Sequence, residues 1–131
     1  MRLSAYSNIY KMETRKLEQE IILLHERICS ALGDSTRILI LYLLFQKDLF
    51  VNELSDELNV PQSTVSRHLK ILRERNLVTT NRQGTAILYS LADKRIIRSL
   101  DLMREILAEQ INTEAAITSA TQESIKSPLR S

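Results

Sequence analysis

The sequence predicts a mainly α-helical (α+β) domain that carries one β-hairpin. Three observations favour this class. Among 131 residues there are only two glycines and two prolines, too few for the tight turns of a many-stranded sheet. Apolar residues recur at helical spacing through most of the chain, and a looser alternation replaces that spacing between residues 77 and 91. The composition, 44% hydrophobic and 26% charged, is that of a globular protein large enough to bury one core.

Cysteine usage and hydropathy exclude several classes of protein. The single cysteine, Cys29, rules out an internal disulfide and a Cys-x-x-Cys metal site, and it fits a reducing compartment. No run approaches 18 apolar residues, and the N-terminus lacks the apolar segment of a secretory signal. We therefore expect a cytoplasmic protein that does not enter a membrane.

Positive charge is concentrated in one part of the chain. The formal net charge is only +2, yet residues 59–91 hold five Lys and Arg residues against a single acid, Glu74. A local basic patch on a nearly neutral protein indicates a polyanionic partner.

The first helix is expected over about residues 14–32, after a weakly ordered segment at 1–13. Its apolar residues repeat at spacings of four and three, which suits packing against another helix, and Gly33 is a typical helix terminator. The residues of this stripe that we assign to a subunit interface are Leu17, Ile21, Leu24 and Ile28.

A second helix is expected over about residues 35–46, with Asp34 as its N-cap. Residues 38–45 are apolar on every side, which predicts a helix in the middle of the core. A buried strand is the alternative for so short an apolar run. The Asp34 cap and the absence of valine favour the helix.

Residues 51–58 and 61–76 read as two short helices with a tight turn at 59–60. Asn59 tolerates the left-handed backbone that such a turn requires, and Pro61 suits the first turn of a helix. Two helices joined in this way form a helix-turn-helix. The second of them turns an apolar face inward, formed by Val65, Leu69 and Leu72.

Residues 77–82 and 86–91 are expected to pair as a hairpin around a turn at Gln83-Gly84. A last helix follows over about 94–112, and the segment 113–131 has the composition of a disordered tail. The apolar residues of the last helix that we assign to the subunit interface are Ile96, Leu100, Met103 and Leu107. The order of elements is that of a winged helix-turn-helix, with one domain over residues 14–112.

The outer face of the helix at 61–76 contains no acid, whereas a solvated helix usually mixes both signs. Short polar residues in its first turn suit base edges in a major groove, Arg67 suits a guanine, and Lys70 and Arg73 suit phosphates. The wing tip would reach the DNA backbone or a minor groove. The alternative is that these residues only start and solubilise the helix. The candidate DNA contacts are Gln62, Ser63, Thr64, Ser66, Arg67, Lys70, Arg73, Arg82, Gln83 and Thr85.

Two stretches closely resemble ArsR-type repressors: ALGDSTRILILYLL at 31–44 and VNELSDELNVPQSTVSRHLKILRERNLVTTNRQGTAILYSLAD at 51–93. The resemblance implies a cytoplasmic homodimer that assembles through its first and last helices. Its two recognition helices would lie about 34 Å apart and bind an inverted repeat in double-stranded DNA. It also implies a repressor that an effector releases, and it adds His68 to the candidate DNA-binding residues, in helix support or phosphate contact.

The sequence departs from the family at its metal sites. Many members bind metal through a Cys-x-Cys pair, but here the matching segment 48–54 has Phe50 and Asn52 at those positions. The last helix contains no histidine. We therefore expect no cofactor and leave the effector unknown. His25 and Cys29 could bind a metal between two subunits, or two Cys29 thiols could form a disulfide, but a small buried Cys29 beside a polar His25 is the favoured interpretation.

The residues argue against two other functions. An enzyme is not expected, because the chain has no nucleophile elbow, zinc-protease motif or phosphate loop, and only two histidines. A winged helix used only for protein contact would carry an apolar or acidic outer face on residues 62–73, and this face is polar and basic. The sequence predicts a sequence-specific DNA-binding regulator, and only the resemblance favours a repressor over an activator.

Overall fold

The structure, a computed structural model, describes the backbone of residues 2–129 and the side chains of residue 11 and residues 13–123. The chain divides into two compact units, residues 1–93 and 94–131, and each is described by itself.

The first unit opens with α1 (Arg2–Leu24) and a five-residue π-helix, η1 (His25–Cys29). The amide of Ser30 donates to the carbonyl oxygen of His25 at 2.8 Å, which is the wide turn that defines η1. Helix α1 begins at Arg2, not near Thr14 as expected, since residues 2–13 contain no glycine or proline to interrupt it. Every described side chain of α1 and η1 is exposed.

The expected bounds of the second helix are confirmed by α2 (Ser35–Gln46). The Asp34 carboxylate accepts hydrogen bonds from the amides of Thr36 (2.8 Å) and Arg37 (3.3 Å), which is the expected N-cap. Ile40, Leu41 and Leu44 are buried in the core. The expectation that this helix is buried on every side is wrong, however, because Leu39 is 52% exposed and Phe45 is 47% exposed.

The helix-turn-helix is formed by α3 (Val51–Leu58) and α4 (Gln62–Glu74). Asn59 ends α3 with φ of 53°, the left-handed conformation expected of it. Helix α4 is shorter than predicted at both ends, and Pro61 is its N-cap residue. Its inward face, Val65, Leu69 and Leu72, is completely buried, as expected.

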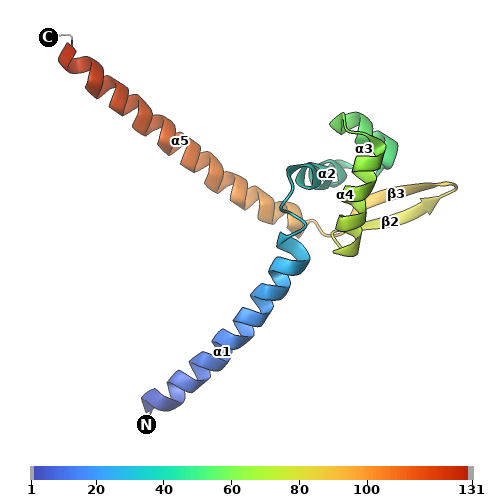
Figure 1. The fold of residues 1–131 in the computed structure, drawn as a ribbon, viewed down its shortest axis with the longest axis horizontal. Coiled ribbons are helices and arrows are strands. Elements are labelled where there is room, and N and C mark those ends of the chain that lie inside the picture. Colours follow the sequence, from blue (N-terminus) through green and yellow to red (C-terminus); the bar gives the residue numbers. More distant parts are fainter. Residues whose placement is uncertain (1, 130–131) are drawn as a thin grey trace. The chain divides into compact units, whose positions relative to one another are not determined.

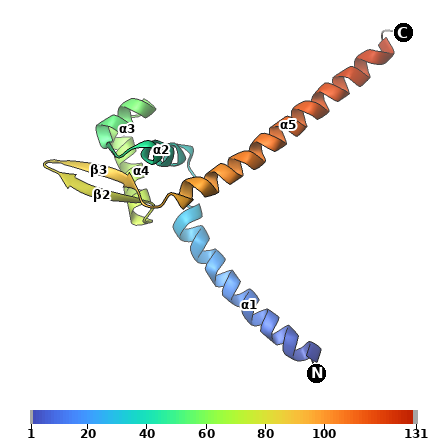
Figure 2. The same cartoon turned by 180° about the vertical axis from the view of Figure 1, so that it is seen from behind.

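The wing is a hairpin of β2 (Val78–Gln83) and β3 (Ala86–Leu91), with Gly84 at φ of 64° in its turn. A third strand, β1 (Leu49–Phe50), pairs with β3 and gives the order β1-β3-β2, all antiparallel. The sequence did not predict β1, because two residues are too short to show an alternation. Figures 1 and 2 show the tip of the hairpin extending beyond α3 and α4.

The second unit is one helix, α5 (Arg95–Leu129). The expected disorder of 113–131 is wrong for residues 113–129, which continue the helix. This segment contains no glycine, its only proline is at position 128, and its three alanines are strong helix formers, although serine and threonine are more numerous. Residues 130–131 lie outside the described part of the chain. Within that part, no helix has the length and hydrophobicity needed to cross a membrane.

Candidate nucleic-acid interface

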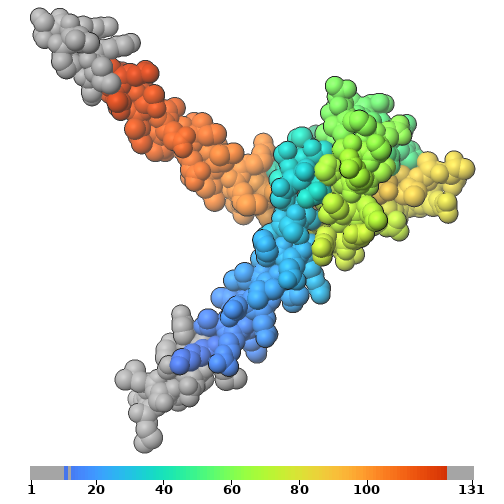
Figure 3. All heavy atoms as spheres, viewed as in Figure 1, coloured from blue at the N-terminus to red at the C-terminus, as the bar shows by residue number. Residues whose placement is uncertain are grey.

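The outer face of α4 is presented to solvent as the sequence predicts. Because α4 buries Val65, Leu69 and Leu72, the residues between them must point outward. In the space-filling view, α4 lies at the surface of its unit beside the yellow wing (Figure 3). The exposed residues of this outward face, before Glu74 ends the helix, are Gln62, Ser63, Ser66, Arg67, Lys70 and Arg73.

Arg67 and Thr64 form a pair at the first turns of α4. An Nη atom of Arg67 donates to the Thr64 hydroxyl oxygen at 3.3 Å. Thr64 is half-buried and does not cap α4, whose N-cap residue, Pro61, makes no side-chain capping bond. The pair holds the Arg67 guanidinium near the N-terminal end of the helix, where a recognition helix meets base edges.

His68 differs from the other candidate DNA contacts. It is half-buried on the side of α4, and its Nδ1 lies 3.3 Å from an Nη atom of Arg37 on α2. This placement fits the helix support implied by the family resemblance.

The wing tip is exposed to solvent. Arg82, Gln83 and Thr85 are accessible around Gly84, and Arg82 and Gln83 pair with Ile87 and Ala86 of β3. The candidate wing residues are therefore held on a regular hairpin.

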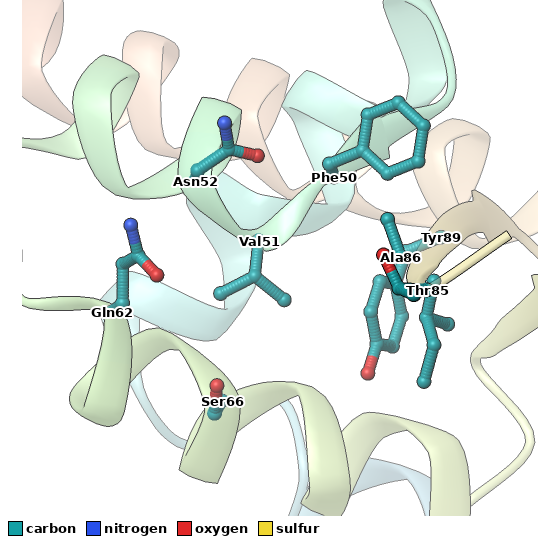
Figure 4. A pocket seen from close by; sticks show the side chains of 9 residues that line it. Phe50, Val51, Asn52, Gln62, Ser66, Thr85, Ala86 and Tyr89 are labelled. Carbon is teal, nitrogen blue, oxygen red and sulfur yellow. The ribbon is translucent and has the colours of Figure 1, made fainter. Parts of the chain in front are cut away.

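A groove of about 410 Å³ lies between the start of α3, the first turns of α4, and the wing. Figure 4 shows the Gln62 and Asn52 amides at one end, with Tyr89 and Thr85 at the other and Ser66 pointing in from α4. Its nine lining residues include no charged side chain.

The groove adds Phe50, Asn52 and Tyr89 to the surface beside the candidate contacts. The sequence alone did not indicate that these residues share a surface, because they come from segments far apart in the chain. The pairing of β1 with β3 brings Phe50 opposite Leu88, next to Tyr89.

The predicted subunit interface is exposed in the single chain, with two exceptions. Leu17, Ile21, Leu24 and Ile28 are all exposed on α1 and η1, as are Met103 and Leu107 on α5. Ile96 is half-buried, and Leu100 is only 6% exposed. Leu100 therefore offers little surface to a second subunit.

His25 and Cys29 are the first and last residues of η1, and both are exposed. The favoured interpretation of Cys29 as a buried residue is wrong for the single chain. Among the described residues, no three His, Cys, Asp or Glu side chains are grouped so that they could hold a metal ion.

Residues 34–80 match the model of the family described as "Bacterial regulatory protein, arsR family". The HTH-type transcriptional regulator MJ1325 of Methanocaldococcus jannaschii is 38% identical over 80 residues, which are 60% of this chain and 90% of that protein. The HTH-type transcriptional repressor SmtB of Mycobacterium tuberculosis is 41% identical over 60% of this chain and 58% of its own length. The transcriptional activator HlyU of Vibrio cholerae is 28% identical over 78% of this chain and 89% of its own.

Solved structures of similar proteins have the same fold as this chain. Rv0081 of M. tuberculosis superposes with a TM-score of 0.65 at 30% identity, covering 72% of this chain and 96% of that one. The Mycobacterium bovis protein Mb0332, described as a homodimeric winged helix-turn-helix DNA-binding domain, superposes with a TM-score of 0.63 at 26% identity over 72% of this chain and 87% of that one. The winged helix-turn-helix fold expected from the sequence is thereby confirmed.

Proposed function

This chain belongs to the arsR family of bacterial regulatory proteins, a family of DNA-binding transcriptional regulators, and we propose that it is a repressor that binds an inverted-repeat operator as a homodimer. The observation that carries the proposal is the outward face of α4, which is exposed, polar and basic and has no acid before Glu74. Such a face matches the phosphates and base edges of a duplex.

The two exposed apolar stripes support the homodimer. Leu17, Ile21 and Leu24 on α1 and Met103 and Leu107 on α5 are each about half exposed. So much contiguous apolar surface on helices is typical of a protein interface. The exposure is greater than predicted, since Ile22, Leu23, Leu102, Ile106 and Ile111 are exposed as well.

Repression is proposed over activation for a physical reason. Blocking a promoter requires only tight binding at the right place, whereas activation requires a further contact surface for the transcription machinery. The relatives include both the repressor SmtB and the activator HlyU. Transcription in vitro from a promoter that carries the operator tests whether the protein represses or activates. A repressor lowers the amount of transcript, and an activator raises it.

Salt dependence tests DNA binding itself. We expect the affinity for a duplex to fall on the order of 10³-fold between about 50 and about 200 mM salt, because each phosphate contact releases counterions. Fluorescence anisotropy with a labelled duplex measures the fall. A winged helix that serves only protein contacts would show no duplex affinity at either concentration.

We also propose that DNA binding needs no resident metal. The candidate ligands are the pair His25 and Cys29, which could complete a tetrahedral site only if the second subunit added the same pair. Treatment with a chelator, followed by dialysis, should leave the DNA affinity and the dimer unchanged. Stoichiometric zinc in the purified protein, together with lost affinity after chelation, would contradict this.

A further inference from the structure

The side chain of Arg37 joins three segments that are separate in the sequence. It extends from α2, where it is half-buried. Its Nε donates to the carbonyl oxygen of Ala31 at 2.6 Å, and Nη2 donates to that of Ser30 at 3.3 Å. Its Nη1 lies 3.3 Å from Nδ1 of His68 on α4. One guanidinium therefore connects the end of η1 to the helix that carries the candidate base contacts.

The chemistry of this cluster fixes the state of the histidine. A guanidinium has five donors and no acceptor, so Nδ1 of His68 must accept the hydrogen bond from Arg37. The imidazole is then neutral, with its proton on Nε2. A protonated ring could not accept this bond.

The carbonyls of Ser30 and Ala31 explain why a cation is suited to this place. They follow the last turn of η1, where carbonyl groups carry partial negative charge, and the Ser30 carbonyl also accepts from the Gly33 amide at 3.3 Å. The planar guanidinium can satisfy two such oxygens and still present a third donor to His68. A lysine ammonium, a single point on a flexible stem, cannot reproduce that geometry.

The contact between Arg37 and His68 lies beside the residues expected to bind DNA. Arg67 and Lys70, both exposed, lie one residue before and two residues after it on α4. Because α4 is rigid, a rotation about its axis at His68 displaces both outward side chains. Errors of about 1 Å in a binding site are enough to weaken it.

We propose that Arg37 is a positioning residue for DNA recognition: it holds α4, through His68, against the carbonyls at the end of η1. The orientation of the base-reading face thereby depends on the segment that directly follows α1. This inference rests on the proposed DNA binding of the outward face of α4. Arg37 itself does not touch DNA, and its donors are directed into the protein.

The test compares specific and non-specific DNA binding by the full chain. The specific probe is the tightest duplex that the wild-type chain selects from a random-sequence library, and the second probe is a random duplex. Arg37→Lys keeps the charge but loses the planar fork. We expect it to weaken specific binding on the order of tenfold and to leave random-duplex binding and the salt slope unchanged.

A double-mutant cycle tests whether Arg37 acts through His68. His68→Ala should weaken specific binding to a similar extent, and the Arg37→Lys/His68→Ala double variant should be no weaker than either single variant. His68→Asn is the matched control, since the amide Oδ1 of asparagine can accept a hydrogen bond where Nδ1 did. It should keep affinity close to wild type. Thermal unfolding and sedimentation check that each variant is folded and keeps the wild-type assembly state.

Other results would overturn the proposal. A third variant, Arg37→Met, removes the charge that Arg37→Lys keeps, and a salt slope reduced by about one in Arg37→Met would make Arg37 a phosphate contact. Losses that multiply in the double variant would show that the two residues act separately, and unchanged specific binding would show no positioning role. If the wild-type chain selects no duplex at all, the proposed DNA binding fails instead.

Discussion

Asp34 and Arg67 are the two single residues to which the fold and the proposed function give the clearest roles. Asp34 caps α2 through its carboxylate. Burial raises the pKa of this carboxyl group, but hydrogen bonds from the amides of Arg37 and Thr36 and the positive charge of the Arg37 guanidinium outweigh that effect. The net pKa is lowered from its ordinary value of 3.8, so the folded state favours the ionised cap.

Replacement of Asp34 should separate capping from charge. Asp34→Ala removes the acceptor and should cost about 1 kcal/mol of unfolding free energy near pH 7, whereas Asp34→Asn keeps an oxygen acceptor and should cost less. Because the folded pKa is lowered, the charge contribution is complete above pH 3.8 and is lost as the pH falls through the lower folded value. Urea unfolding of wild type and Asp34→Asn from neutral to acidic pH measures this charge contribution. If the difference in unfolding free energy between wild type and Asp34→Asn stayed constant down to strong acid, the ionised Asp34 carboxylate would not stabilise the fold.

Arg67 is the residue we expect to read a base. It is exposed, and its guanidinium reaches back toward the first turn of α4, where it donates to Thr64. Arg67→Ala should cost about 1–3 kcal/mol of specific binding and relax the preference at one base position. Lys70→Ala is the matched control on the same face, and it should weaken binding to all sequences alike. If Arg67→Ala also weakens all duplexes equally, Arg67 contacts phosphate instead.

At the scale of elements, the turn between α3 and α4 orients the helix that carries the candidate base contacts. Ser55 holds this turn from both sides: its hydroxyl donates to the carbonyl of Val60, and its own carbonyl accepts from the amide of Val60 at 3.2 Å. Asn59 supplies the left-handed residue between them. The turn is therefore defined by both backbone conformation and hydrogen bonding.

Substitution at Asn59 tests the strain in that turn. Asn59→Ala places an ordinary residue at φ of 53° and should lower the unfolding free energy by about 1–2 kcal/mol. Asn59→Gly, which tolerates this conformation, should stay close to wild type. Chemical denaturation compares the two. Equal stability of the alanine and glycine variants would mean that the backbone at position 59 is not left-handed in solution.

At the scale of the whole molecule, the exposed apolar stripes of α1 and α5 decide how the proposed regulator assembles. Met103 and Leu107 remain on the surface, whereas Leu100 is buried. A charge at Leu100 would therefore damage the fold of the chain, and it cannot report on dimerisation alone.

Leu24→Asp and Leu107→Asp should each convert the dimer to a monomer. Both side chains are about half exposed, so a charge there is tolerated in the monomer but not inside an apolar interface. Sedimentation measures the assembly state, and circular dichroism checks that the helices persist. Gln19→Asp is the control, because Gln19 is exposed on α1 and lies outside the stripe of Leu17, Ile21 and Leu24. Dimers that survive both leucine substitutions would rule out this interface.

Local sequence signals determined the parts of this protein that depend on neighbours along the chain. The Asp34 cap, the left-handed Asn59, the buried stripe Val65, Leu69 and Leu72, and the hairpin were predicted from the residues and are present. A cap, a turn and an amphipathic helix each involve residues within a few positions of one another. For the same reason the outward set on α4 could be named before the structure.

Contacts between distant segments were decided only by the tertiary structure. Nothing in the sequence indicated that Arg37 meets His68, that β1 pairs with β3, or that Leu100 is buried while Met103 is not. Helical spacing gives the face on which a residue lies, but not which element packs against that face. The length of α5 was missed for another reason: a polar segment without glycine is compatible with both helix and disorder, and its composition alone does not separate the two.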